Sequence, residues 1–168
     1  TRKYIRNHPP YPFDHGSLQG EAYRLFRFTP SRTLSIAERL YLSALISYPR
    51  TGSQRIPPSL DARGIFKSLA QLTEYRTLVT ALAEKEKLVP NQGKKDDPAH
   101  PPVTPTGALP PKDGLSEPER KIYDLIARRF MAVYGDPSVS ESIEASVDVD
   151  GEIFYLRGRR VVERGWTK

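Results

Sequence analysis

The sequence of 168 residues has no cysteine, a single methionine, two asparagines and no long apolar run. The lack of cysteine excludes a disulfide framework and a cysteine-ligated zinc site. The lack of an apolar run of roughly 20 residues excludes a membrane-spanning helix of ordinary length, and no signal peptide is visible. Few thermolabile residues beside sixteen prolines are typical of proteins from thermophiles. The chain begins with Thr1 rather than methionine, so we expect a segment of a longer protein.

The net charge of +6 is concentrated at the start of the chain. Residues 1–56 hold nine Lys or Arg against three Asp or Glu, whereas residues 57–168 hold seventeen of each. A concentrated positive field favours a polyanion as partner. An anionic membrane surface would fit the charge equally well, but no basic amphipathic helix with exposed large apolar residues accompanies it. We therefore expect a nucleic-acid partner and no membrane.

Apolar residues recur at helical spacing through most of the chain. The spacing and the capping residues predict helices from Ser17 to about Arg27, from Thr29 or Ser31 to Leu45, from Ser59 or Asp61 to Leu72, from Glu74 to Lys87, and from Ser116 to about Tyr134. The second helix should bury a face made of Leu34, Ala37, Tyr41, Ala44 and Leu45. Residues 90–118 carry eight prolines and no helical pattern, and loops of this length are usually functional or mobile.

The period changes near the C-terminus, where apolar residues alternate with polar ones. Val139, Ile143, Val147 and Val149 are all odd-numbered, which predicts a half-buried strand. Asp150-Gly151 is a strong hairpin signal, and an antiparallel strand with a turn or bulge at Gly158 should follow. Helices first and strands last predict an α+β, mainly helical fold, or a helical domain carrying strands that belong elsewhere. The Thr29-Pro30 turn gives the two helices around it a helix-turn-helix outline.

The stretch from Leu45 to Pro57 carries the densest set of chemically useful residues. Pro49 should break the preceding helix and hold Tyr48 in an extended conformation. Side chains two apart in an extended segment share a face, so Tyr48 and Arg50 should point the same way. The donors that follow are suited to phosphate oxygens and are Thr51, Ser53, Gln54 and Arg55. An ordinary helix-ending turn, with a half-buried tyrosine and a solvated arginine, fits the same pattern.

Two further candidates lie outside this stretch. Arg32 and Thr33 fall at the start of the second expected helix, where backbone N–H groups and the helix dipole attract anions. Arg32 is the better candidate for a phosphate contact, although a solvated surface arginine fits its position equally well. His100 lies in the proline-rich loop, where a lone histidine without a partner is usually an ordinary loop residue.

The run Tyr48-Pro49-Arg50-Thr51, with Ser53 and Gln54, resembles the active-site tyrosine motif of type IA DNA topoisomerases, in particular of their archaeal topoisomerase I/III branch. Matches in the same order cover most of the chain, at 13–28, 29–41, 99–107 and 119–130. The third of these segments, Ala99-His100-Pro101-Pro102-Val103, resembles the family's His-Pro-rich motif. Gly52 and Thr104 depart from the family pattern, which often has an acidic or amide residue and a basic residue there.

The resemblance implies a role for each candidate residue. Tyr48 would attack a DNA phosphate and form a transient 5′-phosphotyrosine link, which allows strand passage and religation without ATP. Arg50 would stabilise charge on the phosphoryl oxygens, and His100 would hydrogen-bond a neighbouring phosphate or position the tyrosine. A free phenol loses its proton only near pH ~10, so Tyr48 needs such help. The implied DNA-binding residues are Arg32, Thr33, Thr51, Ser53, Gln54 and Arg55.

The resemblance also implies a division into domains. Residues 1–14 and 138–168 would belong to a β-rich arch domain, and residues 15–137 would form a helical tyrosine domain. The resemblance implies that Mg²⁺ is held by a Toprim domain outside this chain. No Asp-x-Asp pair in this sequence is placed to take over that role. The implied partners are single-stranded DNA and the remaining domains of the same enzyme, in a cytoplasmic, nucleoid-associated setting. By itself, the chain should bind single-stranded DNA without cleaving it efficiently.

Two other classes of protein remain open on the sequence. A non-catalytic nucleic-acid-binding module of helix-turn-helix type needs the basic residues of 1–56 but no chemistry at Tyr48. A protein-interaction domain would instead use the proline-rich loop. Steeply salt-dependent DNA binding would disfavour the interaction domain, and a trapped phosphotyrosine adduct would exclude the non-catalytic module.

Overall fold

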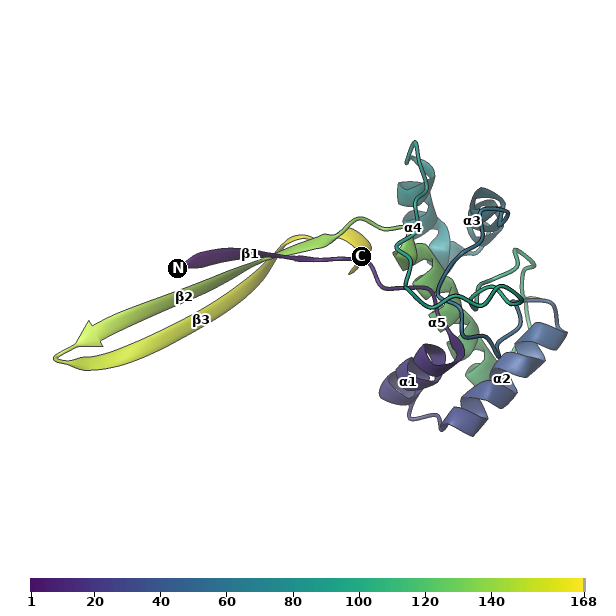
Figure 1. The fold of residues 1–168 in the computed structure, drawn as a ribbon, viewed down its shortest axis with the longest axis horizontal. Coiled ribbons are helices and arrows are strands. Elements are labelled where there is room, and N and C mark those ends of the chain that lie inside the picture. Colours follow the sequence, from purple (N-terminus) through teal and green to yellow (C-terminus); the bar gives the residue numbers. More distant parts are fainter. Residues whose placement is uncertain (168) are drawn as a thin grey trace. The chain divides into compact units, whose positions relative to one another are not determined.

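The computed structural model describes residues 1–167, and the chain divides into two compact units. One unit consists of Thr1–Pro9 with Gly135–Lys168, and the other is the continuous segment Pro10–Tyr134. All of the helices longer than one turn lie in the second unit, and the sheet lies in the first (Figure 1). The described residues therefore combine five α-helices with a three-stranded antiparallel sheet, which confirms a mixed, mainly helical composition.

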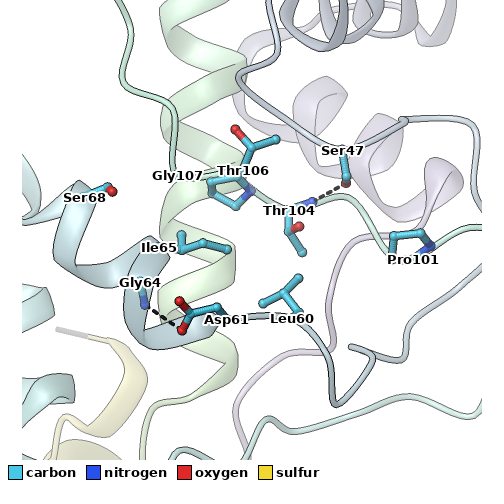
Figure 2. Close-up of a pocket in the computed structure, with 11 residues that line it drawn as sticks. Ser47, Leu60, Asp61, Gly64, Ile65, Ser68, Pro101, Thr104, Thr106 and Gly107 are labelled. Atoms are coloured by element: carbon cyan, nitrogen blue, oxygen red, sulfur yellow. Dashed lines mark hydrogen bonds between the residues drawn. The ribbon is translucent and has the colours of Figure 1, made fainter.

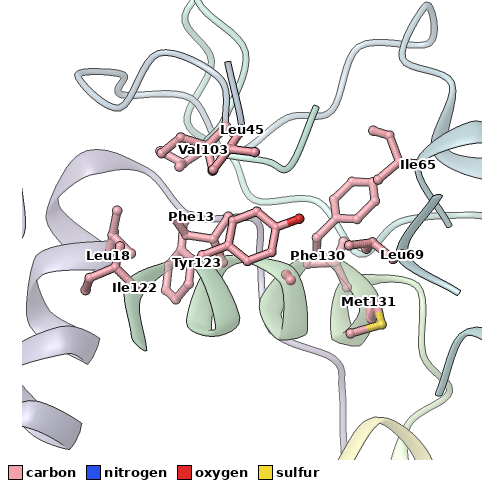
Figure 3. Close-up of a cluster of buried hydrophobic side chains, with 14 of the residues drawn as sticks. Phe13, Leu18, Leu45, Ile65, Leu69, Val103, Ile122, Tyr123, Phe130 and Met131 are labelled. Carbon is pink, nitrogen blue, oxygen red and sulfur yellow. The ribbon is translucent and has the colours of Figure 1, made fainter. Parts of the chain in front are cut away.

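The helical unit is organised around its longest helix. Its elements are α1 (His15–Phe26), α2 (Pro30–Leu42), α3 (Ala62–Leu69), α4 (Thr73–Ala83) and α5 (Glu117–Val133). Helices α1, α2 and α4 contact α5 directly, and α3 packs against α4. Figure 3 shows Ile122, Tyr123, Phe130 and Met131 projecting from α5 into the apolar cluster, where Phe13 meets them.

Local capping chemistry explains where the helices start. The predicted caps Thr29 and Asp61 are confirmed, since each side chain accepts a hydrogen bond from the first turn of its helix. Ser116 and Glu119 form the predicted capping box of α5. The prediction for α1 was wrong by one turn, because Asp14 is the N-cap and Ser17 is its capping-box partner. The Asp14 carboxylate accepts from the Ser17 N–H at 2.7 Å, and the Ser17 hydroxyl accepts from the Asp14 N–H at 3.1 Å.

The end of α2 differs from the prediction. The helix stops at Leu42, well before Pro49, so the proline does not break it. Ala44 has a left-handed φ of 59°. The N–H of Ala44 bonds to the Tyr41 carbonyl and that of Leu45 to the Leu40 carbonyl, which together form a Schellman motif. Such a motif is usually built on glycine, and an alanine in this position hides the signal.

The buried face of α2 also differs from the predicted one. It comprises Thr33, Ile36, Ala37 and Leu40. Of the predicted set, Ala37 and Leu45 are buried, but Tyr41 is 42% exposed, and Ala44 is exposed beyond the helix end. The apolar row thus runs one position earlier than expected, and Tyr41 is left at the surface.

The sheet has the order β1 (Arg2–Asn7), β2 (Ser138–Val149) and β3 (Glu152–Glu163), with antiparallel neighbours. The hairpin prediction is confirmed, since Asp150 and Gly151 both have positive φ. The prediction for Gly158 was wrong, because it pairs with Ile143 inside the strand, and the irregularity lies at Val139/Ser140.

The predicted burial of the alternating strand residues does not hold in this chain. Val147 and Val149 are 45% and 51% exposed, and β3 is exposed along its whole length. In β2 the buried residues are the polar Ser138, Ser140 and Glu141, whereas Val139 and Ile143 are only partly buried. None of the helices in residues 1–167 is long and apolar enough to cross a membrane.

Candidate active site

The segment that carries Tyr48 is held by the proline-rich loop. Ile46 pairs with Pro105 in an isolated antiparallel bridge. The Ser47 N–H donates to the Thr104 carbonyl at 2.9 Å, and the Thr104 N–H donates to the Ser47 hydroxyl at 2.9 Å (Figure 2). That hydroxyl in turn donates to the Pro102 carbonyl at 2.9 Å. The middle of the long loop is therefore fixed against the tyrosine segment, and His100 is brought with it.

Tyr48 is half-buried between two other rings. Its ring centroid lies 5.4 Å from that of His100 and 5.3 Å from that of Tyr41, and the two tyrosine rings are arranged edge to face. His100 Nδ1 lies 3.3 Å from Asp97 Oδ2, within the same loop. The structure thus brings together Tyr48 and His100, which are far apart in the sequence. It adds Tyr41 and Asp97, which sequence reasoning had not assigned to the site.

Arg50 faces the same helix as Tyr48. Its Nε and Nη2 atoms lie 2.8 Å and 2.6 Å from Glu38 Oε1. Glu38 and Tyr41 are three residues apart on α2 and therefore neighbours on its surface. The same row of α2 therefore contacts both residues: Tyr41 contacts Tyr48, and Glu38 contacts Arg50. Glu38 is a third residue missed from the sequence, and its (i, i+3) spacing from Tyr41 was the available signal.

The hydroxyls after Tyr48 are not at the surface. Thr51 and Ser53 are only 2% and 1% exposed. The Thr51 hydroxyl donates to the His100 carbonyl at 3.1 Å and accepts from the Ser53 N–H at 3.0 Å. The Ser53 hydroxyl exchanges hydrogen bonds with the backbone of Arg55. Their predicted phosphate contacts have no support in this structure, where both hydroxyls hold the segment in shape.

Gln54 belongs to a cluster around the buried carboxylate of Asp14. Asp14 Oδ2 accepts from Lys95 Nζ at 2.8 Å and from Gln54 Nε2 at 3.1 Å, and Oδ1 accepts from the Ser17 N–H at 2.7 Å. Burial alone would raise the pKa of Asp14, but the hydrogen bonds from Lys95 and Ser17 outweigh it and lower the pKa. Asp14 thus ties the start of α1, the tyrosine segment and the proline-rich loop together.

The start of α2 offers less to an anion than predicted. Pro30 has no N–H, and the Arg32 N–H donates to the Thr29 hydroxyl at 3.2 Å. Thr33 is fully buried, and its hydroxyl has no hydrogen-bond partner among the described residues, so its predicted DNA contact is not supported. The Arg32 side chain is exposed and lies over the Phe28 ring at 4.3 Å. Arg32 and the exposed Arg55 remain candidates for phosphate contact.

An open hollow of about 580 Å³ lies beside the tyrosine segment (Figure 2). Ser47 and Thr104 line it from one side, and Leu60, Asp61 and Ile65 from the other. Neither Tyr48 nor His100 lines it, so the hollow adjoins the candidate site without being part of it. No group of three or more His, Asp or Glu residues within 1–167 is placed to hold a metal ion.

Comparison with known proteins identifies the class to which this fold and site belong. A family model described as DNA topoisomerase matches residues 1–168, so the chain belongs to that family. The predicted resemblance to type IA topoisomerases is confirmed.

The particular relatives are archaeal enzymes. The chain is 44% identical over 158 residues to DNA topoisomerase 1 of Pyrococcus horikoshii, covering 94% of this chain and 23% of that protein. It is 42% identical over 168 residues to DNA topoisomerase 1 of Methanothermobacter thermautotrophicus, covering 100% of this chain and 23% of that protein. The chain spans about a quarter of the length of these relatives. They are consistent with the predicted archaeal, thermophilic affinity.

A solved structure shares the fold. Full-length topoisomerase I from Thermotoga maritima superposes with a TM-score of 0.71 at 24% identity, covering 99% of this chain and 28% of that chain. At this level of identity the likeness shows the fold alone.

Proposed function

We propose that this chain supplies the DNA-cleaving tyrosine of a longer type IA DNA topoisomerase. The observation that carries the proposal is the position of Tyr48, half-exposed between Tyr41 and His100, with Arg50 on the same helix row. A phosphate that reached the phenol would lie close to a guanidinium that keeps its charge at every working pH. Membership of the topoisomerase family supports this use of the site.

The chemical step is a transesterification on single-stranded DNA. A bond forms between the Tyr48 oxygen and phosphorus as the bond from phosphorus to the 3′-oxygen breaks. The phenol gives up its proton, and the departing 3′-oxygen takes one up. The 5′-phosphotyrosine keeps the energy of the phosphodiester, so the reverse attack reseals the strand without ATP. Strand passage occurs between the two steps.

Three side chains assist this step. Arg50 exchanges Glu38 for the phosphoryl oxygens and stabilises the charge that develops on them. His100 hydrogen-bonds a neighbouring phosphate or positions the Tyr48 ring. Asp97 orients His100 through its carboxylate. Burial alone would raise the pKa of Asp97, but hydrogen bonds from Ala99 and His100 lower it and favour the ionised form.

The remaining parts of the reaction lie outside this chain. Mg²⁺ would be held by a Toprim domain of the longer enzyme, where it would neutralise phosphate charge. The chain alone then binds single-stranded DNA without cleaving it efficiently. Because its substrate would be DNA, we expect the longer enzyme to act in the cytoplasm, at the nucleoid. Mg²⁺-dependent relaxation of supercoiled plasmid by the purified 168-residue chain would contradict this division of labour.

Adduct formation tests the assignment of Tyr48. The longer enzyme is incubated with Mg²⁺ and an end-labelled single-stranded oligonucleotide, and the covalent adduct is resolved on a denaturing gel. We expect Tyr48→Phe to form no adduct, because the nucleophilic oxygen is missing, and Tyr23→Phe to form normal amounts. An adduct with Tyr48→Phe would refute the site. DNA binding without any adduct in the unmodified enzyme would favour the non-catalytic binding module.

A further inference from the structure

Tyr41 is an aromatic side chain at the surface with no share in the core of α2. The buried row of that helix is complete without it, and its ring is 42% exposed. Its ring centroid lies 5.3 Å from that of Tyr48, with an angle of 68° between the ring planes. An exposed ring is therefore held at a fixed angle beside the proposed nucleophile.

We infer that Tyr41 is a stacking platform for an unpaired nucleobase next to the phosphate that Tyr48 attacks. The inference rests on the proposed function, because it places the DNA strand at Tyr48. A phosphate at the Tyr48 oxygen carries a nucleoside on each side, so one flanking base passes close to the neighbouring ring. Exposed aromatic rings bind single-stranded nucleic acid by stacking, which tolerates any base because each base has a π-face. Tyr41 would thus select unpaired DNA without selecting a sequence.

The other side chain in this helix row supports a division of roles. Glu38 is acidic and occupied by Arg50, so it offers nothing attractive to DNA. Tyr41, three residues further on, offers an uncharged surface that the phosphates do not repel. The strand would be held here by a base on Tyr41 and by a phosphate on Arg50. A purely structural role for Tyr41, bracing the Tyr48 ring, would involve no base.

An abasic-site scan separates stacking from bracing. Binding is measured by fluorescence anisotropy with the longer enzyme carrying Tyr48→Phe, so that no cleavage occurs. The oligonucleotides are identical except for one abasic site moved through the positions around the cleavage point. We expect the enzyme with Tyr41 to lose about 5- to 150-fold in affinity when one particular base is missing.

The variants at position 41 give the decisive comparison. Tyr41→Ala should bind the intact oligonucleotide about 5- to 150-fold more weakly than the enzyme with Tyr41. Introducing the abasic site should then cause no further loss of affinity in this variant. Tyr41→Phe, which keeps the ring, should behave like the unmodified residue. Tyr23→Ala is the matched control, because Tyr23 is 52% exposed on α1 of the same unit and should show the full abasic effect.

An equal loss from the abasic site with and without the Tyr41 ring would overturn the inference. A scan in which no abasic position lowers the affinity would also overturn the inference. Either result leaves the proposed function standing as long as the adduct on Tyr48 forms. Failure of the adduct assay would instead refute the nucleophile, while the scan would still report whether a base rests on Tyr41.

Discussion

Arg50 is paired with Glu38 in the structure, and this pairing affects how it could bind a phosphate. Its guanidinium is bound to Glu38 at the surface, where both side chains are partly exposed. Exposed ion pairs contribute only about 0.2–1 kcal/mol, so a phosphate can displace the carboxylate at small cost. The ion pair holds Arg50 in place beside Tyr48 and still leaves it able to bind a phosphate.

Glu38→Gln tests this competition. Removing the carboxylate frees Arg50 for phosphate, so we expect affinity for single-stranded DNA to rise by about 1.5- to 5-fold at low salt. The gain should shrink at high salt, where exposed charges are screened. Anisotropy titrations at two salt concentrations measure both effects.

Glu21→Gln is the matched control for that substitution. Glu21 pairs with Arg24 at 2.7 Å on α1, also at the surface, so its removal changes the net charge equally. An equal gain in both variants would show that net charge alone is responsible. A loss of affinity in Glu38→Gln would show that the pair positions Arg50 rather than competing for it.

At the scale of elements, α2 carries the side chains that face Tyr48 and Arg50. The attachment of α2 to α5 therefore helps to position the candidate site. Arg39 Nε on α2 lies 2.9 Å from Glu119 Oε1 in the first turn of α5. Glu119 also accepts from the Ser116 N–H and hydroxyl. The Ser116 hydroxyl, Arg39 and the Ser116 N–H together lower the pKa of Glu119 from 4.5 to about 2.

This carboxylate should make stability depend on pH. Its pKa is lower in the folded chain, so its stabilisation is complete above the unfolded value near 4.5 and is lost as the pH falls toward about 2. We expect Glu119→Gln to unfold at a lower temperature at pH 7, with a difference that narrows as the pH falls through that window. Thermal melts followed by circular dichroism at several pH values measure it.

Glu117→Gln serves as the comparison within the same helix turn. Glu117 pairs with Lys121 inside α5 and makes no link to α2, but it experiences the same helix dipole. Its substitution should therefore have a smaller effect at pH 7. Equal effects would mean that the dipole, and not the contact between helices, accounts for the role of Glu119.

For the whole molecule, burial is concentrated in one of the two units. Every buried hydrophobic residue of the described chain lies within Phe13–Tyr134, whereas the sheet of the other unit exposes most of its large apolar side chains. Burial of apolar surface is the main source of folding stability. The helical unit thus carries a core of its own, whereas none of the buried hydrophobic residues of the described chain lies in the sheet.

A truncation tests this division. We expect residues 10–134 alone to remain helical and to unfold cooperatively, with a midpoint close to that of the whole chain. The measurement is a thermal melt at 222 nm, with the 168-residue chain as the control. A broad or absent transition in the truncated protein would show that residues 1–9 and 135–168 are needed for the helical fold.

Local chemistry was sufficient to predict many features from the sequence. The caps at Thr29, Asp61 and Ser116 and the Asp150-Gly151 hairpin depend on residues a few positions apart, and all are confirmed. The end of α2 was missed because Ala44 adopts a conformation that usually belongs to glycine. The buried row of α2 was misplaced because periodicity fixes the spacing of a face but not which neighbouring row meets the core.

The candidate site divides in the same way. The sequence by itself was enough to select Tyr48, Arg50 and His100 as candidates, because the order and spacing of residues in these motifs are written along the chain. Only the tertiary structure decided that Thr33, Thr51 and Ser53 are buried, and that Glu38 and Tyr41 face the site. The physical reason is that burial and partnership depend on packing between segments distant in the sequence, which no local pattern specifies.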